Sequence, residues 1–261
     1  MWELQNNMLF GIAAGFALNG MIPFVPVYSS FLQRGFDQLV HDIAIPNLHV
    51  IVCVDRAGVV GNDGETHHGL FDLAFFRLIP NFTIMAPKDF NELEKMLEFA
   101  VNINGPVAIR YPRGSEEKEF KKCEEIVLGN HEVLKVGKNA TILAIGKMVA
   151  RAQKIADNLL CENIDATVIN MRFLKPINEE QILNEIKNKK IVITIEDGTE
   201  INGLGNVIEE IIVKNKLKCK FVKYAYPDEF IKQGSIKEIE NKYNISEEAI
   251  ARDILEKFIE I

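Results

Sequence analysis

The segment of residues 55–69 constrains this chain more than any other, because it joins a buried strand to a loop rich in reactive side chains. An apolar run at residues 48–54 precedes it, which is typical of a parallel strand buried on both faces. Four glycines, two aspartates, an arginine and two adjacent histidines follow within fifteen positions. Glycine permits tight turns and close approach to a ligand, and imidazoles beside carboxylates are the usual parts of proton-transfer sites. A glycine-rich charged loop is often only a solvated turn, but this concentration of polar groups predicts a functional loop.

Strand-like apolar runs alternate with helical patterns through the first part of the chain, which predicts a sheet of parallel strands covered by helices. Asp89, followed by Glu92, predicts an N-cap with a capping box at one helix start. Tyr28, Asp55 and Arg110 fall at the expected carboxyl ends of strands, which is where ligands bind in such sheets. The expected strands lie at residues 23–28, 48–54, 82–85 and 107–109, and the expected helices at 8–18, 31–43, 71–78 and 91–101.

A second α/β unit with the same rhythm follows, so the predicted fold class is α/β with two parallel-sheet domains. The predicted boundaries are residues 1–114 for the first domain, 115–137 for a linker of lower apolar density and 138–261 for the second domain. In the second domain, strands are expected at residues 140–145, 166–170, 190–195 and 219–222, with helices at 148–160, 177–186 and 204–213 and two more near the end of the chain.

Short motifs along the chain are similar to those of a known enzyme family. They read YSSFLQRGFDQ at residues 28–38, DRAGVVGNDGETHHG at 55–69, GLFDL at 69–73, RYPRG at 110–114, MRFLKP at 171–176 and PDEFIKQG at 227–234. Their sequence and spacing resemble the 1-deoxy-D-xylulose-5-phosphate synthases, which belong to the transketolase-like thiamine diphosphate enzymes. The resemblance covers nearly the whole chain. It implies a pyrimidine-binding transketolase-like domain, truncated at its amino end, followed by a transketolase C-terminal domain.

The resemblance also implies roles for residues around the cofactor, thiamine diphosphate. Phe31 would stack on the aminopyrimidine ring, with Tyr28 beside it; a phenylalanine of the hydrophobic core is the alternative at position 31. Arg34 would border the substrate. Asp63 and His67 would be the catalytic groups beside the substrate and the cofactor ring.

Two arginines would bind the substrate phosphate. By resemblance, Arg56 and Arg113 would hold the phosphate of glyceraldehyde 3-phosphate, while pyruvate is the other substrate. Paired guanidinium groups suit phosphate oxygens. For either arginine alone, a surface ion pair is the alternative.

Two features depart from the family. The position of its catalytic glutamate holds Asn6 here, and an amide cannot exchange a proton as a carboxyl group does. Glu3 lies three residues earlier and would need a backbone irregularity to take that place, so the choice between the two stays open. The family's diphosphate-binding domain, which has a GDG signature and holds Mg²⁺, has no counterpart here, because residues 62–64 and 196–198 lack the expected context. We therefore expect no metal ligands in this chain.

Three functional hypotheses follow. The first is the carboxyl-terminal part of a synthase for 1-deoxy-D-xylulose 5-phosphate, a precursor in isoprenoid and thiamine biosynthesis, which is active only with a partner chain that carries the diphosphate-binding domain. The second is a non-catalytic remnant or regulatory binding module of the same fold. The third is a β-subunit-like partner of a 2-oxo acid dehydrogenase, but the loop at residues 55–69 and the motif at 110–114 match the synthases more closely.

Composition indicates an ordinary globular protein. Hydrophobic residues make up 48% and charged residues 26% of the 261 residues, and the net charge is −7, so nothing indicates a nucleic-acid or membrane partner. The four cysteines lie far apart, which predicts buried or inert thiols in a reducing cytoplasm. The helix expected at residues 8–18 is apolar nearly all round and predicts self-association, as a homo-oligomer or with a partner chain.

Overall fold

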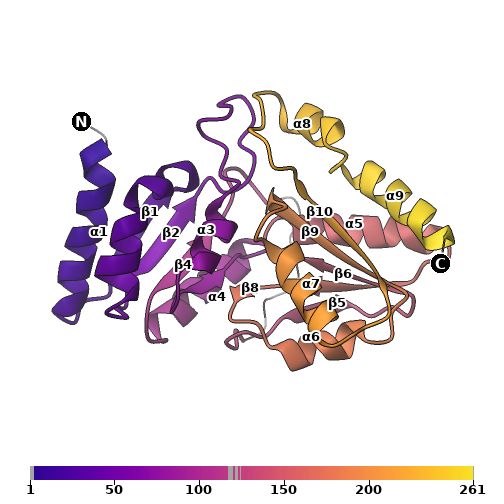
Figure 1. Ribbon diagram of the computed structural model, residues 1–261, viewed down its shortest axis with the longest axis horizontal. Coiled ribbons are helices and arrows are strands. Elements are labelled where there is room, and N and C mark those ends of the chain that lie inside the picture. The colour runs from indigo at the N-terminus through magenta and orange to yellow at the C-terminus, as the bar shows by residue number, and fades with distance from the viewer. Residues whose placement is uncertain (1–2, 117–119, 121–122, 124, 261) are drawn as a thin grey trace.

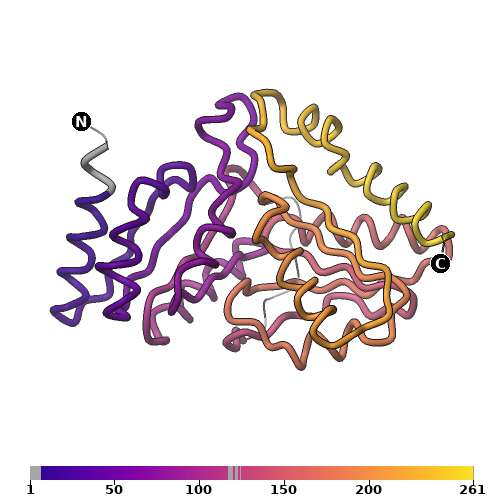
Figure 2. Tube along the Cα trace, in the orientation of Figure 1, coloured from indigo at the N-terminus to yellow at the C-terminus, as the bar shows by residue number. Residues whose placement is uncertain are grey.

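Two α/β units follow one another along the chain and pack side by side (Figure 1). The computed structural model describes residues 3–116, 120, 123 and 125–260. The amino terminus lies at the outer end of the first unit and the carboxyl terminus at the opposite end of the molecule, as the trace shows (Figure 2). The two-domain α/β architecture predicted from the sequence is confirmed.

The first sheet has five strands in the order β1-β2-β4-β3-β8. Its first four strands are parallel, as predicted, whereas β8 pairs antiparallel with β3 and comes from the second half of the chain. Local periodicity did not predict β8, because it is a three-residue strand whose partner is far away in the sequence. The strands are β1 (Phe24–Tyr28), β2 (Ile51–Asp55), β4 (Val107–Arg110), β3 (Thr83–Met85) and β8 (Phe173–Lys175).

The helices of the first unit agree with the prediction except over residues 31–43. That segment forms a 3-10 helix (Ser29–Gly35), one short α turn and a π helix (Leu39–Ala44) instead of a single α-helix. A β-carbon built on Gly35 would lie 2.3 Å from the Phe10 ring, so close packing requires glycine there. Glycine lowers α-helix propensity by about 1 kcal/mol, which favours a break. The α-helices are α1 (Glu3–Leu18), α2 (Phe36–Gln38), α3 (Asp72–Leu78) and α4 (Phe90–Val101).

The second sheet has the order β10-β9-β6-β7-β5. Its edge strand β5 pairs antiparallel with β7 and lies within residues 115–137, where the sequence analysis expected a linker. As an exposed edge, β5 buries little apolar surface, so it has no strong apolar pattern. The strands are β10 (Lys220–Tyr226), β9 (Ile191–Thr199), β6 (Ala140–Ala144), β7 (Ala166–Asn170) and β5 (Glu132–Lys135); the helices are α5 (Met148–Cys161), α6 (Glu179–Ile186), α7 (Leu204–Lys214), α8 (Ile236–Lys242) and α9 (Glu247–Ile259).

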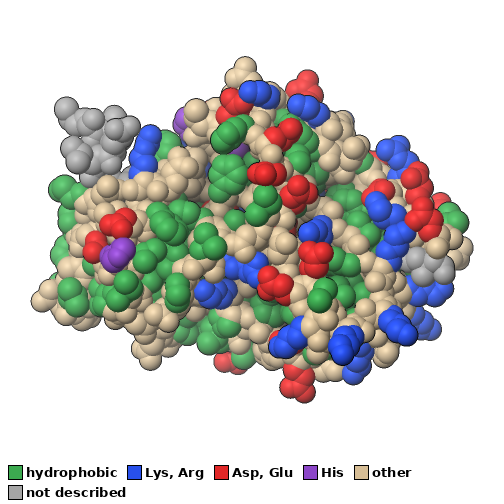
Figure 3. All heavy atoms as spheres, viewed as in Figure 1, with side chains coloured by type: hydrophobic (Ala, Val, Ile, Leu, Met, Phe, Trp, Pro, Cys, Tyr) green, Lys and Arg blue, Asp and Glu red, His purple; other side chains and the backbone are tan. Residues whose placement is uncertain are grey.

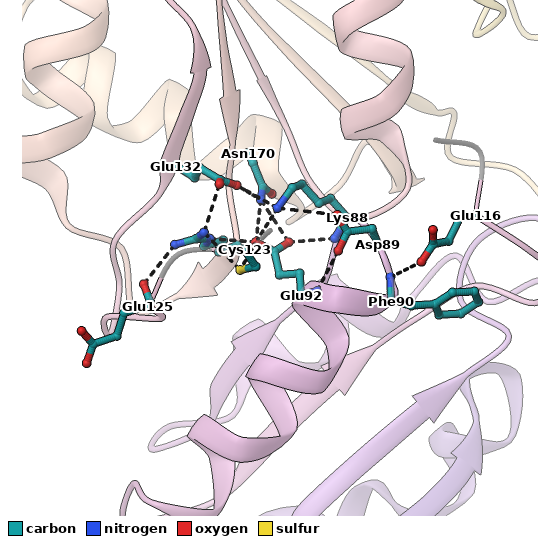
Figure 4. Close-up of polar contacts among 10 residues, drawn as sticks. Lys88, Asp89, Phe90, Glu92, Glu116, Cys123, Glu125, Glu132 and Asn170 are labelled. Atoms are coloured by element: carbon teal, nitrogen blue, oxygen red, sulfur yellow. Dashed lines mark hydrogen bonds and ion pairs between the residues drawn. The ribbon is translucent and has the colours of Figure 1, made fainter. Parts of the chain in front are cut away.

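A buried charge cluster around Glu92 joins the two units (Figure 4). Asp89 is the N-cap of α4, as predicted, since its carboxylate accepts a hydrogen bond from the Glu92 backbone at 2.7 Å. The predicted capping box is wrong, because the Glu92 carboxylate turns inward. It lies 3.2 Å from Lys88 Nζ and 2.8 Å from Arg172 Nε, and it accepts a hydrogen bond from Asn170 at 2.9 Å. The attraction of the Glu92 carboxylate to the buried charges of Lys88 and Arg172 outweighs the backbone hydrogen bond that a capping box would provide.

Glu132 completes this charge cluster from β5. Its carboxylate oxygens lie 2.9 Å from Lys88 Nζ and 3.3 Å from Arg172 Nη2. Burial alone would raise the pKa of Glu132, but hydrogen bonds from Lys88 and Asn170 and the charges of Lys88 and Arg172 lower it overall. The boundary between the units is therefore held by paired charges as well as by the strand β8.

Helix α1 leaves an apolar face uncovered. Phe10, Ala13 and Ala14 pack into the core, whereas Ile12 and Phe16 are 46% and 49% exposed. Other exposed apolar side chains continue this surface onto the start of β1, and hydrophobic side chains are visible on that end of the molecule (Figure 3). Because water contact with so much apolar surface is unfavourable, this face is suited to association.

The four cysteines differ in exposure. Cys53 and Cys123 are buried and Cys219 is half-buried, but Cys161 is exposed, and all four thiols are free. None of the helices in the described part of the chain is both long and apolar enough to cross a bilayer.

Candidate active site

The candidate site lies at the carboxyl edge of the first sheet. The register pairs Tyr28 on β1 with Asp55 on β2, and Val54 on β2 with Arg110 on β4. The polar ends of three neighbouring strands therefore meet at one edge, which is where ligands bind in parallel α/β sheets. The loops that carry the other predicted residues leave from this edge.

The loop after β2 is closed at its base. The backbone N–H of Gly58 donates to the Gly69 carbonyl at 2.7 Å, and the N–H of Gly69 donates to the Gly58 carbonyl at 2.8 Å. Arg56 has a φ of 58° and its backbone N–H donates to the Asp55 carboxylate at 2.7 Å. This left-handed conformation costs about 1–2 kcal/mol for a residue with a side chain. In this conformation the Arg56 guanidinium lies over the ring of Tyr28 on the neighbouring strand.

Tyr28 and Phe31 form an aromatic group that lies beside the loop. The ring centroids of Tyr28 and Phe31 lie 5.5 Å apart. The ring centroids of Phe31 and His67 lie 5.7 Å apart, and these two rings meet edge to face. Arg56 lies over the Tyr28 ring at 4.0 Å and Arg34 lies 5.8 Å from the Phe31 ring. Phe31 is half-buried and packs against the core with part of its ring, so its other surface is accessible.

Two guanidinium groups converge on one carboxylate. Asp63 Oδ2 lies 3.1 Å from Arg113 Nη1 and 3.7 Å from Arg56 Nη1. The exposed fractions of these side chains, 57% for Arg113 and 26% for Arg56, leave both open to a solute. Since one carboxylate shared between two arginines neutralises only part of their charge, the pair can also accept an anion such as phosphate.

The two adjacent histidines have different environments. His67 faces the aromatic group and its Nδ1 lies 2.9 Å from Thr66 Oγ1. His68 is buried, and its Nδ1 accepts a hydrogen bond from the Val60 N–H at 3.1 Å. Burial lowers the pKa of His68, so this ring is neutral at pH 7 with its proton on Nε2. His67 is therefore the accessible imidazole.

The structure brings all seven predicted site residues into one connected group. Asn6 and Glu3 lie in α1, with side chains outside the described part of the structure, and this helix runs without interruption from Glu3. The choice between Asn6 and Glu3 therefore lies outside the described side chains. The connected residues are Tyr28, Phe31, Arg34, Arg56, Asp63, His67 and Arg113.

A buried ion network beneath the loop was not predicted as a unit. Arg110 Nε donates to the Asp72 carboxylate at 3.0 Å, and Arg110 Nη1 donates to Asp197 Oδ1 at 2.5 Å. Lys147 Nζ lies 3.2 Å from Asp197 Oδ2. Burial alone would raise the pKa of Asp197, but the charges of Arg110 and Lys147 outweigh it and hold that pKa well below its ordinary value. The only local signal was Arg110 at the end of a strand.

Among residues 3–116, 120, 123 and 125–260, no three histidine, cysteine or carboxylate side chains gather in a way that could hold a metal ion. The site as described offers aromatic rings, an imidazole, a carboxylate and two guanidinium groups. These groups can stack on a heterocycle, move protons and bind an anion.

Two domain families match this chain. The transketolase pyrimidine-binding domain matches residues 5–118, and the transketolase C-terminal domain matches residues 129–250, which includes β5. A solved structure described as a split gene transketolase, an inactive beta4 tetramer, has a TM-score of 0.90 and 30% identity, over 97% of this chain and 82% of that chain. The chain belongs to the transketolase family.

Within this family, curated relatives of high identity carry one name. The 1-deoxy-D-xylulose-5-phosphate synthase of Caldanaerobacter subterraneus is 43% identical over 251 residues, and synthase 2 of Geobacter sulfurreducens is also 43% identical over 251 residues. These alignments cover 95% of this chain but 40% of each relative, so the chain spans about two fifths of their length. The transketolase of Campylobacter jejuni shares the fold, with a TM-score of 0.74 and 22% identity over 94% of this chain and 37% of that one.

Proposed function

We propose that this chain forms the pyrimidine-binding and carboxyl-terminal part of a 1-deoxy-D-xylulose-5-phosphate synthase. The enzyme would join pyruvate and glyceraldehyde 3-phosphate to give 1-deoxy-D-xylulose 5-phosphate and CO₂, in the cytoplasm. The observation that carries the proposal is the convergence of an aromatic group, His67, and the Asp63–arginine group at one strand edge. The names of the relatives support the same reaction.

The aromatic group suits the pyrimidine ring of thiamine diphosphate. Phe31 is half-buried beside Tyr28, so it offers a ring surface on which a flat heterocycle can stack. When bound, thiamine diphosphate supplies a nucleophilic carbon that adds to a carbonyl group. In this chain, Tyr28 and Phe31 would hold the ring, while His67 would move protons at the reacting carbonyl.

The arginines suit the phosphate of glyceraldehyde 3-phosphate. Arg56 and Arg113 share Asp63 in the structure, and a phosphate with two negative charges would compete for both guanidinium groups. Displacement from the arginines would leave the Asp63 carboxylate, which belongs to the same loop as His67, available for proton transfer. Arg34, near the Phe31 ring, would border the same substrate.

The diphosphate group and its Mg²⁺ would be held by residues outside these 261. Those residues would belong either to a longer chain that forms a homo-oligomer or to a separate partner chain. The relatives are about two and a half times as long as the matched segment, which leaves room for such a domain in them. A non-catalytic binding module is the second candidate, because a similar solved structure is described as inactive and because Asn6 replaces the family's glutamate. The names of the relatives argue against a 2-oxo acid dehydrogenase subunit.

Replacing Arg113 tests the phosphate site. We expect Arg113→Ala to weaken binding of glyceraldehyde 3-phosphate about tenfold to a hundredfold, because one charge-assisted hydrogen bond is lost. Titration calorimetry on the chain supplied with a diphosphate-binding domain measures this. Arg252→Ala, an exposed arginine on α9, is the matched control and should bind normally. Equal affinity of folded wild type and Arg113→Ala would assign Arg113 to a surface ion pair.

Self-association through the exposed face of α1 is a further expectation. Sedimentation at tens of micromolar, an order-of-magnitude range for weak association, should show species larger than the monomer. Phe16→Glu should shift the protein toward monomer because it places a charge on the apolar face. Val213→Glu, at an apolar residue on α7 that is even more exposed, should not. A monomer alone at these concentrations would contradict the expectation.

A further inference from the structure

We propose that the second unit positions the catalytic loop, by holding residues 58–69 at the base and at the tip. This inference rests on the proposed function, since it concerns how Asp63 and His67 are placed. Asp63 lies within the tip, and His67 lies between the tip and the base. The contacts that carry it come from β9, the start of α5 and the segment before α8.

At the base, the loop fits directly over the charges of the second unit. A β-carbon built on Gly58 would lie 2.1 Å from Asp197 Oδ2 and 3.2 Å from Lys147 Nζ. Gly58 has a φ of 77°, so glycine is required there both by conformation and by space. The position of the Asp197–Lys147 pair thus determines the path that the loop backbone takes at this turn.

The same network reaches the other end of the loop. Arg110 links Asp197 to Asp72, and Ser29 Oγ donates to Asp72 Oδ2 at 3.1 Å. A β-carbon built on Gly69 would lie 2.5 Å from Ser29 Oγ. Because Gly58 and Gly69 are hydrogen-bonded to each other, the chain of contacts from Asp197 to Ser29 fixes both strands of the loop base.

At the tip, the loop meets the segment that leads into α8, and the two run side by side in both backbone views (Figures 1 and 2). Glu65 forms an ion pair with Lys232, and the Gly234 N–H points to the Gly61 carbonyl at 3.5 Å. A β-carbon on Gly64 would lie 3.1 Å from the Gln233 side chain. These contacts lie on both sides of Asp63.

Apolar burial holds the base of this loop but not its tip, because Val59 is buried and packs in a hydrophobic cluster with residues of the second unit. Residues 62, 63, 65 and 66 are exposed and His67 is only half-buried. With little apolar area to anchor it, the loop tip depends on its polar contacts with the second unit. A positioning role for Lys147 therefore predicts a local effect, confined to the loop, when its charge is removed.

Hydrogen exchange followed by mass spectrometry on the full chain tests this. In Lys147→Met, the amides of residues 58–69 should exchange about tenfold to a hundredfold faster, because one charge-assisted contact under the loop is lost. Lys232→Met should speed exchange at the tip alone. Lys147→Arg keeps the charge and should exchange as wild type does. Lys135→Met, which breaks the remote Lys135–Asp157 pair, is the matched control and should leave the loop unchanged.

Two outcomes overturn the proposal. One is loop exchange in Lys147→Met and Lys232→Met that equals wild type while both variants remain folded. The other is faster exchange throughout the second unit, which would assign these lysines to general stability. The measurement needs no cofactor or substrate, so it separates this proposal from the proposed function, whose failure would appear as absent thiamine diphosphate binding with the loop result intact.

Discussion

The 261-residue chain, assayed by itself with pyruvate, glyceraldehyde 3-phosphate, thiamine diphosphate and Mg²⁺, should form no 1-deoxy-D-xylulose 5-phosphate above background. In the proposed function, the aromatic group at Phe31 would hold the pyrimidine end of the cofactor, and the diphosphate end with its Mg²⁺ would depend on residues outside these 261. Without the diphosphate end in place, the cofactor would be neither bound nor oriented. Clear turnover by the chain alone would refute both the partner requirement and the division of the cofactor site.

Reconstitution separates the two expected causes of inactivity, which are the lack of a diphosphate-binding domain and the asparagine at position 6. With a diphosphate-binding domain supplied, the chain should bind thiamine diphosphate, measurable by calorimetry even if no product forms. If Asn6 is the remaining obstacle, Asn6→Glu should then raise turnover by roughly 10²–10⁴-fold, the usual contribution of a positioned acid–base group. Asn7→Glu, at the neighbouring helix position, is the matched control and should give no such gain.

Removing the charge of Glu92 should lower the free energy of unfolding by about 3–5 kcal/mol, since breaking a buried ion pair leaves its partners uncompensated. In Glu92→Gln, the side chain keeps its size, but Lys88 and Arg172 lose the carboxylate that lies 3.2 and 2.8 Å from them. Urea unfolding at pH 7, followed by circular dichroism, measures the change. Glu94→Gln, on the exposed face of α4, should change stability by less than about 0.5 kcal/mol.

A loss of less than about 1 kcal/mol in Glu92→Gln would contradict this expectation. It would show that Glu132, which contacts both cations, is sufficient to compensate them. The double variant with Glu132→Gln would then show a loss larger than the sum of the two single variants.

The parallel strands and the site loop could be predicted because their signals are local. The apolar run before residue 55 and the glycines after it specify a strand and a tight loop within about twenty residues of sequence. Parallel pairing of the two strands then places Tyr28 beside Asp55 at their carboxyl ends, so a correct prediction of both strands is enough to predict this contact. The grouping of the predicted site residues follows from that topology.

What the sequence did not show depends on pairs of residues far apart. Asp197 meets Arg110 across eighty-seven positions, and Arg172 meets Glu92 across eighty. No periodicity within one segment records such a pairing, so Glu92 was interpreted from its nearest neighbours as part of a helix cap. His67 and His68 likewise have the same residue type in adjacent positions, and only the fold shows that one is accessible and the other buried.

Strand β8 has a consequence for how the protein forms during synthesis. The edge of β3 is covered only when residues 173–175 arrive, roughly ninety residues after β3 itself. At translation rates of about 5–20 residues per second, the nascent first unit would wait about 5–20 seconds with that strand edge unpaired. An unpaired edge is a template for pairing with another chain. The first unit is therefore expected to depend on the second for protection from aggregation on the ribosome, and the two have to mature as a single folding unit.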